Sequence, residues 1–237
     1  MSLHVRWPRW KLDNAVPFPE PTQGIPVKIC GLKSADAAIV ASDAGADYLG
    51  FNFVEGVRRQ LQPEDGIRII TDYRAGRKTQ NKPGIVGLFL NQDPDFVNDL
   101  SHNAGLDYLQ LCGDEDADYI SKIELPVFKM VRVKSGSTPD DLDNLVSPFL
   151  DAGHGIVLDR YDKATPGGSG LAFDWSAAEG IADRNRVLLA GGLTPENVQS
   201  AIHQLSPWGV DVASGVETNG VKDPVRIKAF INAARSA

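Results

Sequence analysis

The chain has 237 residues, of which 42% are hydrophobic and 23% are charged, and its formal net charge is −7. This composition is ordinary for a globular protein that buries a sizeable core. The negative charge, with no basic run that alternates with aromatic residues, argues against nucleic acid as a partner. No apolar stretch approaches the roughly twenty residues that a bilayer span requires, so we expect no membrane association.

The first part of the chain, residues 1–25, differs from the rest. It mixes tryptophan, proline and charged residues and has no continuous apolar segment of the kind found in a signal peptide. We therefore predict an irregular N-terminal extension, and the sequence leaves open whether Trp7 and Trp10 pack against the body of the protein.

The only two cysteines, Cys30 and Cys112, form no CxxC pair, which favours a reducing compartment. Cytoplasm is the expected location.

From residue 26 onward, short apolar runs alternate with amphipathic stretches of helical spacing. The expected strands are residues 26–30, 47–53, 84–90, 107–112, 126–133, 155–159, 186–191 and 209–214. The expected helices are residues 34–46, 62–74, 93–105, 114–123, 138–153, 173–183, 194–205 and 223–236.

These eight strand–helix units follow one another without a break in composition. The strands are apolar on both faces, as buried parallel strands are. The pattern predicts a chain of the α/β class in which residues 26–237 form a single (β/α)₈ TIM barrel behind the N-terminal extension. The rival is an open doubly wound sheet, which would usually place its phosphate-binding glycines after the first strand. Here the glycines follow the last three strands, so the barrel is favoured.

In such barrels the active site lies at the carboxyl ends of the strands. Cys30 ends the first expected strand and Asp159 ends the sixth. The structural alternative for Cys30 is that it fills the core as a small buried apolar residue. For Asp159 the structural alternative is a helix cap or a salt bridge to Arg160 or Lys163. Their shared position at strand ends favours a functional role for both.

Three glycine-rich stretches follow the last three strands: "PGGSG", "AGGLTPENV" and "ASGVE". Glycine allows the backbone to approach an anion closely, and phosphate tends to bind after strands seven and eight of these barrels. Tight structural turns are the alternative, but three such loops together favour a phosphate site. Its expected members are Gly168, Ser169, Gly170, Gly191, Gly192, Ser214 and Gly215.

Several stretches occur together in a characteristic order: "VKICGL", "GADYLGFNF", "RQLQP", "VGLFLN", "LQLCGDE", "GGSGLAFDW", "AGGLTPENV" and "VDVASGVETNGVKD". In this order and spacing the chain, from Val27 to its C-terminus, resembles the phosphoribosylanthranilate isomerase family of tryptophan biosynthesis. The pairing of "KICG" near the start with "SGVE" near the end makes the resemblance specific, whereas any single stretch would be weak.

The resemblance implies an Amadori rearrangement of N-(5-phosphoribosyl)anthranilate to 1-(2-carboxyphenylamino)-1-deoxyribulose 5-phosphate, without a cofactor. It assigns Cys30 as the base that takes a proton from C2′ and Asp159 as the acid that protonates the ring oxygen. A catalytic thiol benefits from nearby positive charge, and an acidic aspartate needs burial or negative neighbours to keep its proton.

The resemblance also implies three substrate-binding residues. Arg59 aligns with an arginine that resembles an anchor for the anthranilate carboxylate, and a solvated loop charge is its alternative. Asp211 matches a site position of unspecified role. Cys112 stands where the family has histidine, in "QLCG", which puts one substrate contact in doubt. Because strands one and four lie across the barrel, we expect no Cys30–Cys112 disulfide.

Two alternatives remain open from the sequence. One is a diverged paralogue that binds or isomerises another phosphorylated sugar derivative, and the other is a phosphometabolite-binding barrel without catalysis. We see neither a strand-end lysine of the indole-glycerol-phosphate synthase kind nor the metal-binding histidine set of an epimerase, and no metal site is indicated. The expected partner is a small phosphoribosyl substrate, and the protein is expected to be a monomer or a homodimer.

Overall fold

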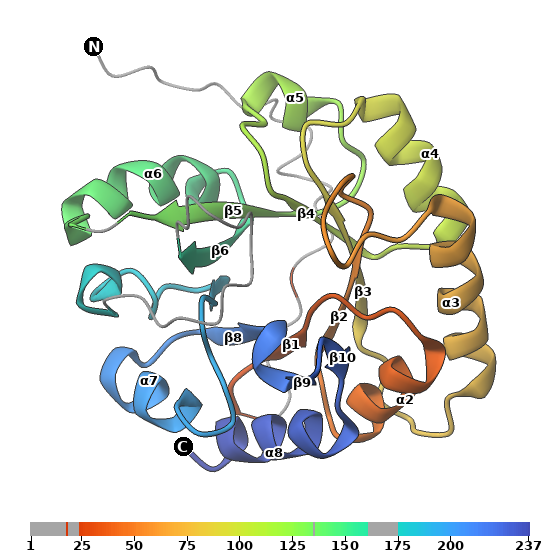
Figure 1. Cartoon of the computed structure of the whole chain (residues 1–237). Coiled ribbons are helices and arrows are strands. Elements are labelled where there is room, and N and C mark those ends of the chain that lie inside the picture. The colour runs from red at the N-terminus through yellow and green to blue at the C-terminus, as the bar shows by residue number, and fades with distance from the viewer. Residues whose placement is uncertain (1–17, 19–23, 135, 161–174) are drawn as a thin grey trace.

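The computed structural model describes residues 18, 24–134, 136–160 and 175–237. In this part of the chain, eight parallel strands pair in sequence order and close into a barrel, because β1 pairs with both β2 and β8. Helices surround the strands on the outside (Figure 1). The predicted (β/α)₈ architecture is confirmed. The strands are β1 (Val27–Ile29), β2 (Tyr48–Asn52), β3 (Gly84–Phe89), β4 (Tyr108–Leu111), β5 (Val127–Val133), β6 (Gly155–Arg160), β7 (Val187–Leu189) and β8 (Gly209–Val212).

Five of the described helices begin with side-chain caps that the sequence makes visible, whereas α3 and α7 have no such hydrogen bond. Thr138 and Asp141 form a reciprocal capping box at the start of α6, and Asp93 and Asp223 cap α4 and α8. Proline occupies the first turn of several helices, where its missing N–H costs nothing. The helices are α2 (Ala35–Asp43), α3 (Pro63–Gly76), α4 (Pro94–Ala104), α5 (Ala117–Ser121), α6 (Pro139–Asp151), α7 (Val198–Leu205) and α8 (Pro224–Arg235).

Two local predictions were wrong, and one feature after β8 was not predicted. The helix expected at residues 173–183 is a single 3₁₀ turn, η1 (Trp175–Ala178), within the described residues. The helix expected from Thr194 begins at Val198, because the Asn197 side chain accepts a hydrogen bond from the Thr194 N–H and holds a turn there. After β8, the chain adds a 3₁₀ turn, η2 (Ser214–Val216), and a small hairpin of β9 (Glu217–Thr218) and β10 (Val221–Lys222), which we did not expect.

The core has two layers, as a barrel requires. The larger one lies between the strands and the helices, and it contains alternate strand residues such as Ile29 and Leu49. The smaller one fills the barrel itself and contains Cys30, Cys112 and a set of aromatic rings. Because strand side chains alternate in direction, residues 28 and 30 of the first strand both belong to the barrel interior.

The amino-terminal end of the barrel is closed by aromatic residues. Phe18 is the only residue before Gly24 that the structure describes, and its ring centroid lies 5.4 Å from that of Tyr108 and 4.7 Å from that of Phe128. Tyr48 adds a further edge-to-face contact. The N-terminal extension therefore reaches the base of the barrel at Phe18. Trp7 and Trp10 lie outside the described residues.

Candidate active site

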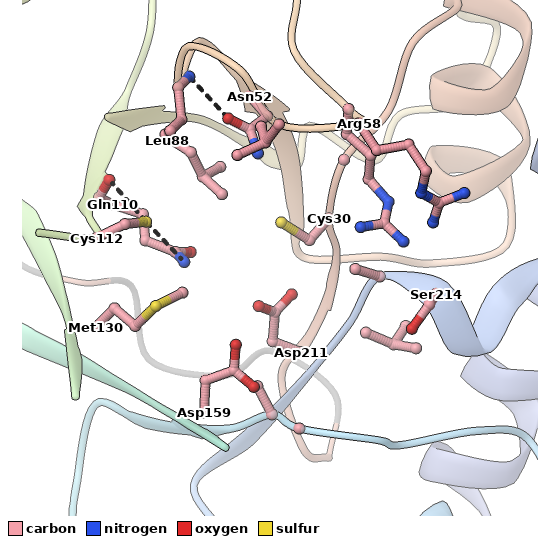
Figure 2. A pocket seen from close by; sticks show the side chains of 18 of the residues that line it. Cys30, Asn52, Arg58, Leu88, Gln110, Cys112, Met130, Asp159, Asp211 and Ser214 are labelled. Atoms are coloured by element: carbon pink, nitrogen blue, oxygen red, sulfur yellow. Dashed lines mark hydrogen bonds between the residues drawn. The ribbon is translucent and has the colours of Figure 1, made fainter. Parts of the chain in front are cut away.

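The described residues enclose a cavity of about 300 Å³ at the carboxyl ends of the strands. It is lined by eight of the residues that the sequence analysis singled out: Cys30, Arg59, Cys112, Asp159, Gly191, Gly192, Asp211 and Ser214. A concave site at this end of a barrel is where its chemistry is expected. Figure 2 shows the side chains of Cys30, Asp159 and Asp211 directed into this cavity from different strands.

Cys30 follows β1 directly and is 6% exposed. Its backbone N–H donates to the Val212 carbonyl, which continues the pairing of β1 with β8 and fixes the direction of the thiol. On β2, Gly50 leaves the thiol its space, since a Cβ there would lie 3.0 Å from the Cys30 sulfur. A free thiol thus points into the cavity at the end of the first strand.

The groups around Cys30 have opposite effects on the pKa of its thiol. Burial raises the pKa of the thiol above its usual range, the positive charge of Lys28 lowers it, and the carboxylate of Asp211 raises it. Lys222 contributes a further, smaller lowering. The net effect is a raised pKa, so the thiol holds its proton at neutral pH in the free protein.

Asp159 lies on β6, beside Arg132 of β5 in the strand register. Its side chain is partly exposed to the cavity. Lys163, one alternative partner for this carboxyl group, lies outside the described residues, and nothing is described of the Arg160 side chain. Cys30 and Asp159 share one cavity although they lie 129 residues apart in the sequence.

Arg59 is not a solvated loop charge, because its side chain is only 12% exposed. It donates to Glu217 twice, from Nε at 2.6 Å and from Nη2 at 3.0 Å. Its stem packs over Gly31, where any Cβ would collide with it. The neighbouring Arg58, 53% exposed, and Lys222 also bind Glu217, at 2.6 Å and 2.9 Å.

Glu217 is consequently a carboxylate shared by three cations. Burial raises its pKa, but the hydrogen bond from Arg59 and the charge of Lys222 outweigh this effect and lower the pKa to about 2. The cluster carries more positive than negative charge, and both arginines line the cavity. This rim is suited to an anionic group of a ligand.

Cys112 lies just after β4, across the cavity from Cys30 (Figure 2). Both cysteines are free, as expected. The thiol of Cys112 accepts a 3.7 Å hydrogen bond from the side-chain amide of Gln110, and burial raises its pKa to about 12. The Cys112 thiol is therefore neutral, and it is only a weak hydrogen-bond donor to a ligand.

Asp211 projects from β8 into the barrel, where it binds Lys28 with both carboxylate oxygens at 3.1 Å. The sequence analysis missed Lys28. The available signal was a lysine inside the apolar run "PVKIC", two positions before the cysteine on the same face of the strand. Buried lysines are rarely found without a partner.

The glycine loops differ in how far the structure describes them. Gly168, Ser169 and Gly170 lie outside the described residues. Gly191 and Gly192, with φ of 85° and 77°, adopt left-handed conformations that favour glycine. Gly215 does not line the cavity, but a Cβ there would lie 1.9 Å from the Leu193 carbonyl oxygen, so it allows the loops after β7 and β8 to touch.

Further cavity residues escaped the sequence analysis. They share an inward-facing position near the carboxyl end of a strand, and the alternation of side chains along each strand was the signal that could have found them. These residues are Asn52, Leu88, Gln110, Met130 and Ala190.

Among the described residues, no group of three or more histidine, cysteine, aspartate or glutamate side chains could hold a metal ion. None of the helices in that part of the chain has the length and apolar character that a membrane span needs.

The chain is similar to known proteins over most of its length. Residues 27–233 match the family model described as N-(5′-phosphoribosyl)anthranilate (PRA) isomerase. An N-(5′-phosphoribosyl)anthranilate isomerase from Roseiflexus castenholzii is 42% identical over 214 residues, which cover 89% of this chain and 98% of that protein.

Two solved structures resemble the fold closely. One is of monomers generated from the dimeric phosphoribosylanthranilate isomerase of Thermotoga maritima, and it is 34% identical with a TM-score of 0.73. The other is a phosphoribosylanthranilate isomerase in complex with reduced 1-(o-carboxyphenylamino)-1-deoxyribulose 5-phosphate, also 34% identical with a TM-score of 0.73. Both matches cover 90% of this chain and 100% of the solved one.

Proposed function

The chain belongs to the N-(5′-phosphoribosyl)anthranilate isomerase family of tryptophan biosynthesis, and on that premise we propose how its residues carry out the isomerisation. The substrate joins an anthranilate to a phosphorylated ribose, and the product is the corresponding 1-deoxyribulose 5-phosphate. The observation that supports the proposal most is that Cys30 and Asp159 line one cavity.

Asp159 acts first, as the general acid. It donates a proton to the furanose ring oxygen, the bond from C1′ to that oxygen breaks, and the anilino nitrogen supplies the electron pair that forms the imine. A carboxyl group can do this only if it holds its proton near neutral pH. The negative charges of the substrate's phosphate and carboxylate favour that protonated form.

Cys30 acts second, as the general base. Its thiolate removes the proton from C2′, which gives an enolamine. C1′ then gains a proton and the C2′ hydroxyl loses one, which yields the ketone. Because burial and Asp211 raise the pKa of Cys30, the reactive thiolate is a minor form at neutral pH, but it is a strong base once formed. The positive charge of Lys222 supports its formation.

The remaining site residues hold the substrate. Arg59 binds the anthranilate carboxylate through the N–H groups that do not donate to Glu217, while its bonds to Glu217 hold the planar guanidinium in place. Cys112 contacts the aromatic end and Asp211 the sugar. The backbone of the loops after β7 and β8 holds the phosphate, with Gly191, Gly192, Ser214 and Gly215 as its described part. Gly168, Ser169 and Gly170 are proposed as the rest of this phosphate site.

The wider properties are proposals as well. We propose a cofactor-free enzyme of the cytoplasm that is a monomer or a homodimer. Two free cysteines support a reducing compartment, and the dimeric Thermotoga maritima relative supports the dimer. A diverged paralogue or a non-catalytic barrel has no specific observation in its favour.

The experiment is a turnover assay. The labile substrate is generated in the cuvette from anthranilate and phosphoribosyl pyrophosphate, and the loss of its fluorescence is followed with wild type, Cys30→Ser and Asp159→Asn. We expect turnover by the wild type and a loss of at least about 10²-fold in each variant, as is typical for a positioned acid or base. A folded wild-type protein without activity would overturn the proposed function.

A further inference from the structure

Lys28 is a buried ammonium group inside the barrel. It lies on β1, its side chain is 0% exposed, and it is among the largest fully buried side chains of the described residues. Burying a charge is costly unless it is paired. The proposed acid–base chemistry uses Cys30 and Asp159, so the presence of a lysine beneath the cavity needs its own explanation.

The strand register explains how the ammonium is held. Lys28 of β1 lies opposite Asp211 of β8, and both carboxylate oxygens accept from its Nζ at 3.1 Å. Cys30 is two positions beyond Lys28, directly after β1, so its side chain points into the barrel on the same face. The same ammonium that binds Asp211 also interacts electrostatically with the Cys30 thiol.

We propose that Lys28 is a positioning residue that supplies the counter-charge for the Cys30 thiolate, with Asp211 holding the ammonium in place. This inference rests on the proposed role of Cys30 as the base. Lys28 touches no reacting atom in this scheme. It acts through the sulfur, by stabilising the ionised form that removes the C2′ proton.

The other charged and titratable groups around Cys30 come from several elements. Arg58 and Arg59, in the loop after β2, and Arg132 of β5 are cations that line the same cavity. Lys222 of β10 is a further cation, but it is bound to Glu217 at 2.9 Å and to the Ala213 carbonyl at 2.6 Å. The negative or neutral groups are Asp211 of β8, Asp159 of β6 and Cys112 after β4. Among the charges that act on the pKa of Cys30, Lys28 has the largest influence, ahead of Asp211 and Lys222.

Lys28 is a permanent cation over the working pH range. Burial alone would lower its pKa, but the negative charge of Asp211 and the interaction with Cys30 reverse this effect and raise it. Asp211 therefore has two opposite consequences for the thiol. Its own charge disfavours the thiolate, while it keeps the stronger cation protonated and in position.

The test titrates Cys30 itself, without substrate. In a Cys112→Ala background, Cys30 is the only thiol, because the sequence has two cysteines. Thiolate absorbance near 240 nm is recorded against pH, with the Cys30→Ser, Cys112→Ala protein as the blank that removes the tyrosine contribution. We expect Lys28→Met to raise the apparent pKa of Cys30 by at least about one unit, the size typical of a lost neighbouring charge. We also expect kcat to fall about tenfold or more while KM changes little, since the substrate does not contact Lys28.

A matched control distinguishes this effect from loss of any buried lysine. Lys129 is also buried and pairs with Glu115 at 2.6 Å. Lys129→Met should destabilise the fold but leave the pKa of Cys30 unchanged. An equal shift in both variants would assign the change to general loosening and overturn the proposal.

A second variant covers the case in which Lys28→Met does not fold. Lys28→Met with Asp211→Asn removes both charges of the pair, and it should place the pKa of Cys30 above that of the wild type and below that of the single variant. An unchanged pKa in a folded protein lacking Lys28 contradicts the inference. Because this titration needs no turnover, it can fail while the isomerase assay succeeds, and the reverse also holds.

Discussion

Arg59 grips Glu217 through two hydrogen bonds, of 2.6 Å and 3.0 Å, and so ties the loop after β2 to the β9–β10 hairpin at the mouth of the barrel. The planar fork of the arginine is thereby oriented before any ligand arrives. Arg58 and Lys222 bind the same carboxylate, which leaves surplus positive charge beside the cavity. A second carboxylate, that of the substrate, would find an ordered binding group there.

This geometry predicts that Arg59→Lys weakens substrate binding although it keeps the charge. The lysine cannot reproduce the fork, so we expect KM to rise about tenfold to a hundredfold, the range of one charge-assisted hydrogen bond. The kcat should change less. Arg68→Lys is the control, since the Arg68 side chain is exposed on helix α3 and pairs only locally with Asp65 and Asp72. A KM unchanged in Arg59→Lys would remove the arginine from the binding site.

The pKa of Cys30 sets the dependence of the rate on pH. Because burial raises this pKa, the thiol is protonated at neutral pH and only a fraction is the active base. As pH rises toward the pKa that fraction grows, so kcat should increase, by up to about tenfold for each pH unit where deprotonation alone is limiting. The measurement is kcat between pH 6 and 8.5 at saturating substrate. A kcat that falls over this range would argue against Cys30 as the base.

Replacing Cys112 with histidine should leave the activity intact or improve it. Cys112 has a pKa of about 12 and is a weak donor, whereas histidine can donate a full hydrogen bond to the substrate. Cys112→Ser, which is close to the thiol in size, serves as the matched variant. Both are compared by kcat/KM in the fluorescence assay. If both proteins fold and Cys112→His is inactive while Cys112→Ser is active, the site has been rebuilt around a small group at this position.

Gly215 is expected to be intolerant of any side chain. A Cβ there would lie 1.9 Å from the Leu193 carbonyl oxygen, and a backbone atom cannot move aside cheaply. Gly215→Ala should therefore separate the loops after β7 and β8, lower the melting temperature and raise KM for the phosphorylated substrate. Gly180→Ala is the control, because φ is +69° there but nothing lies within 4 Å. An alanine there has only the strain of a left-handed backbone, about 1–2 kcal/mol, and the variant should keep its KM.

The barrel itself could be predicted because its signals are local and repeated. Each strand is a short, largely apolar run, and most helices have a visible start, such as Thr138 before Pro139. The errors occurred where a side chain competes with the backbone, as Asn197 does at the start of α7. The β9–β10 hairpin was missed although Asn219 and Gly220, both with positive φ, form a recognisable turn pair.

The site was only partly accessible to the same reasoning. Strand ends identified Cys30 and Asp159, since a barrel brings all its carboxyl ends to one mouth. Lys28 was missed because its role depends on an ion pair with Asp211, which is 183 residues away in the sequence. In the same way, the grip of Arg59 on Glu217 depends on a hairpin that follows the last barrel strand. The local signal at Lys28, a lysine inside an apolar run, does not show which residue pairs with it.

The central claim is that Asp159 is the general acid of ring opening and Cys30 the general base at C2′. A kinetic isotope effect tests this claim most directly. Substrate deuterated at C2′ is made from phosphoribosyl pyrophosphate carrying deuterium at the corresponding carbon. Cys30→Ser should then show a large primary isotope effect on kcat, because removal of the C2′ proton becomes limiting. Asp159→Asn should show an effect close to one, because ring opening becomes limiting and does not break that bond. The opposite pattern, or equal effects in the two variants, would contradict the assignment of Cys30 as base and Asp159 as acid.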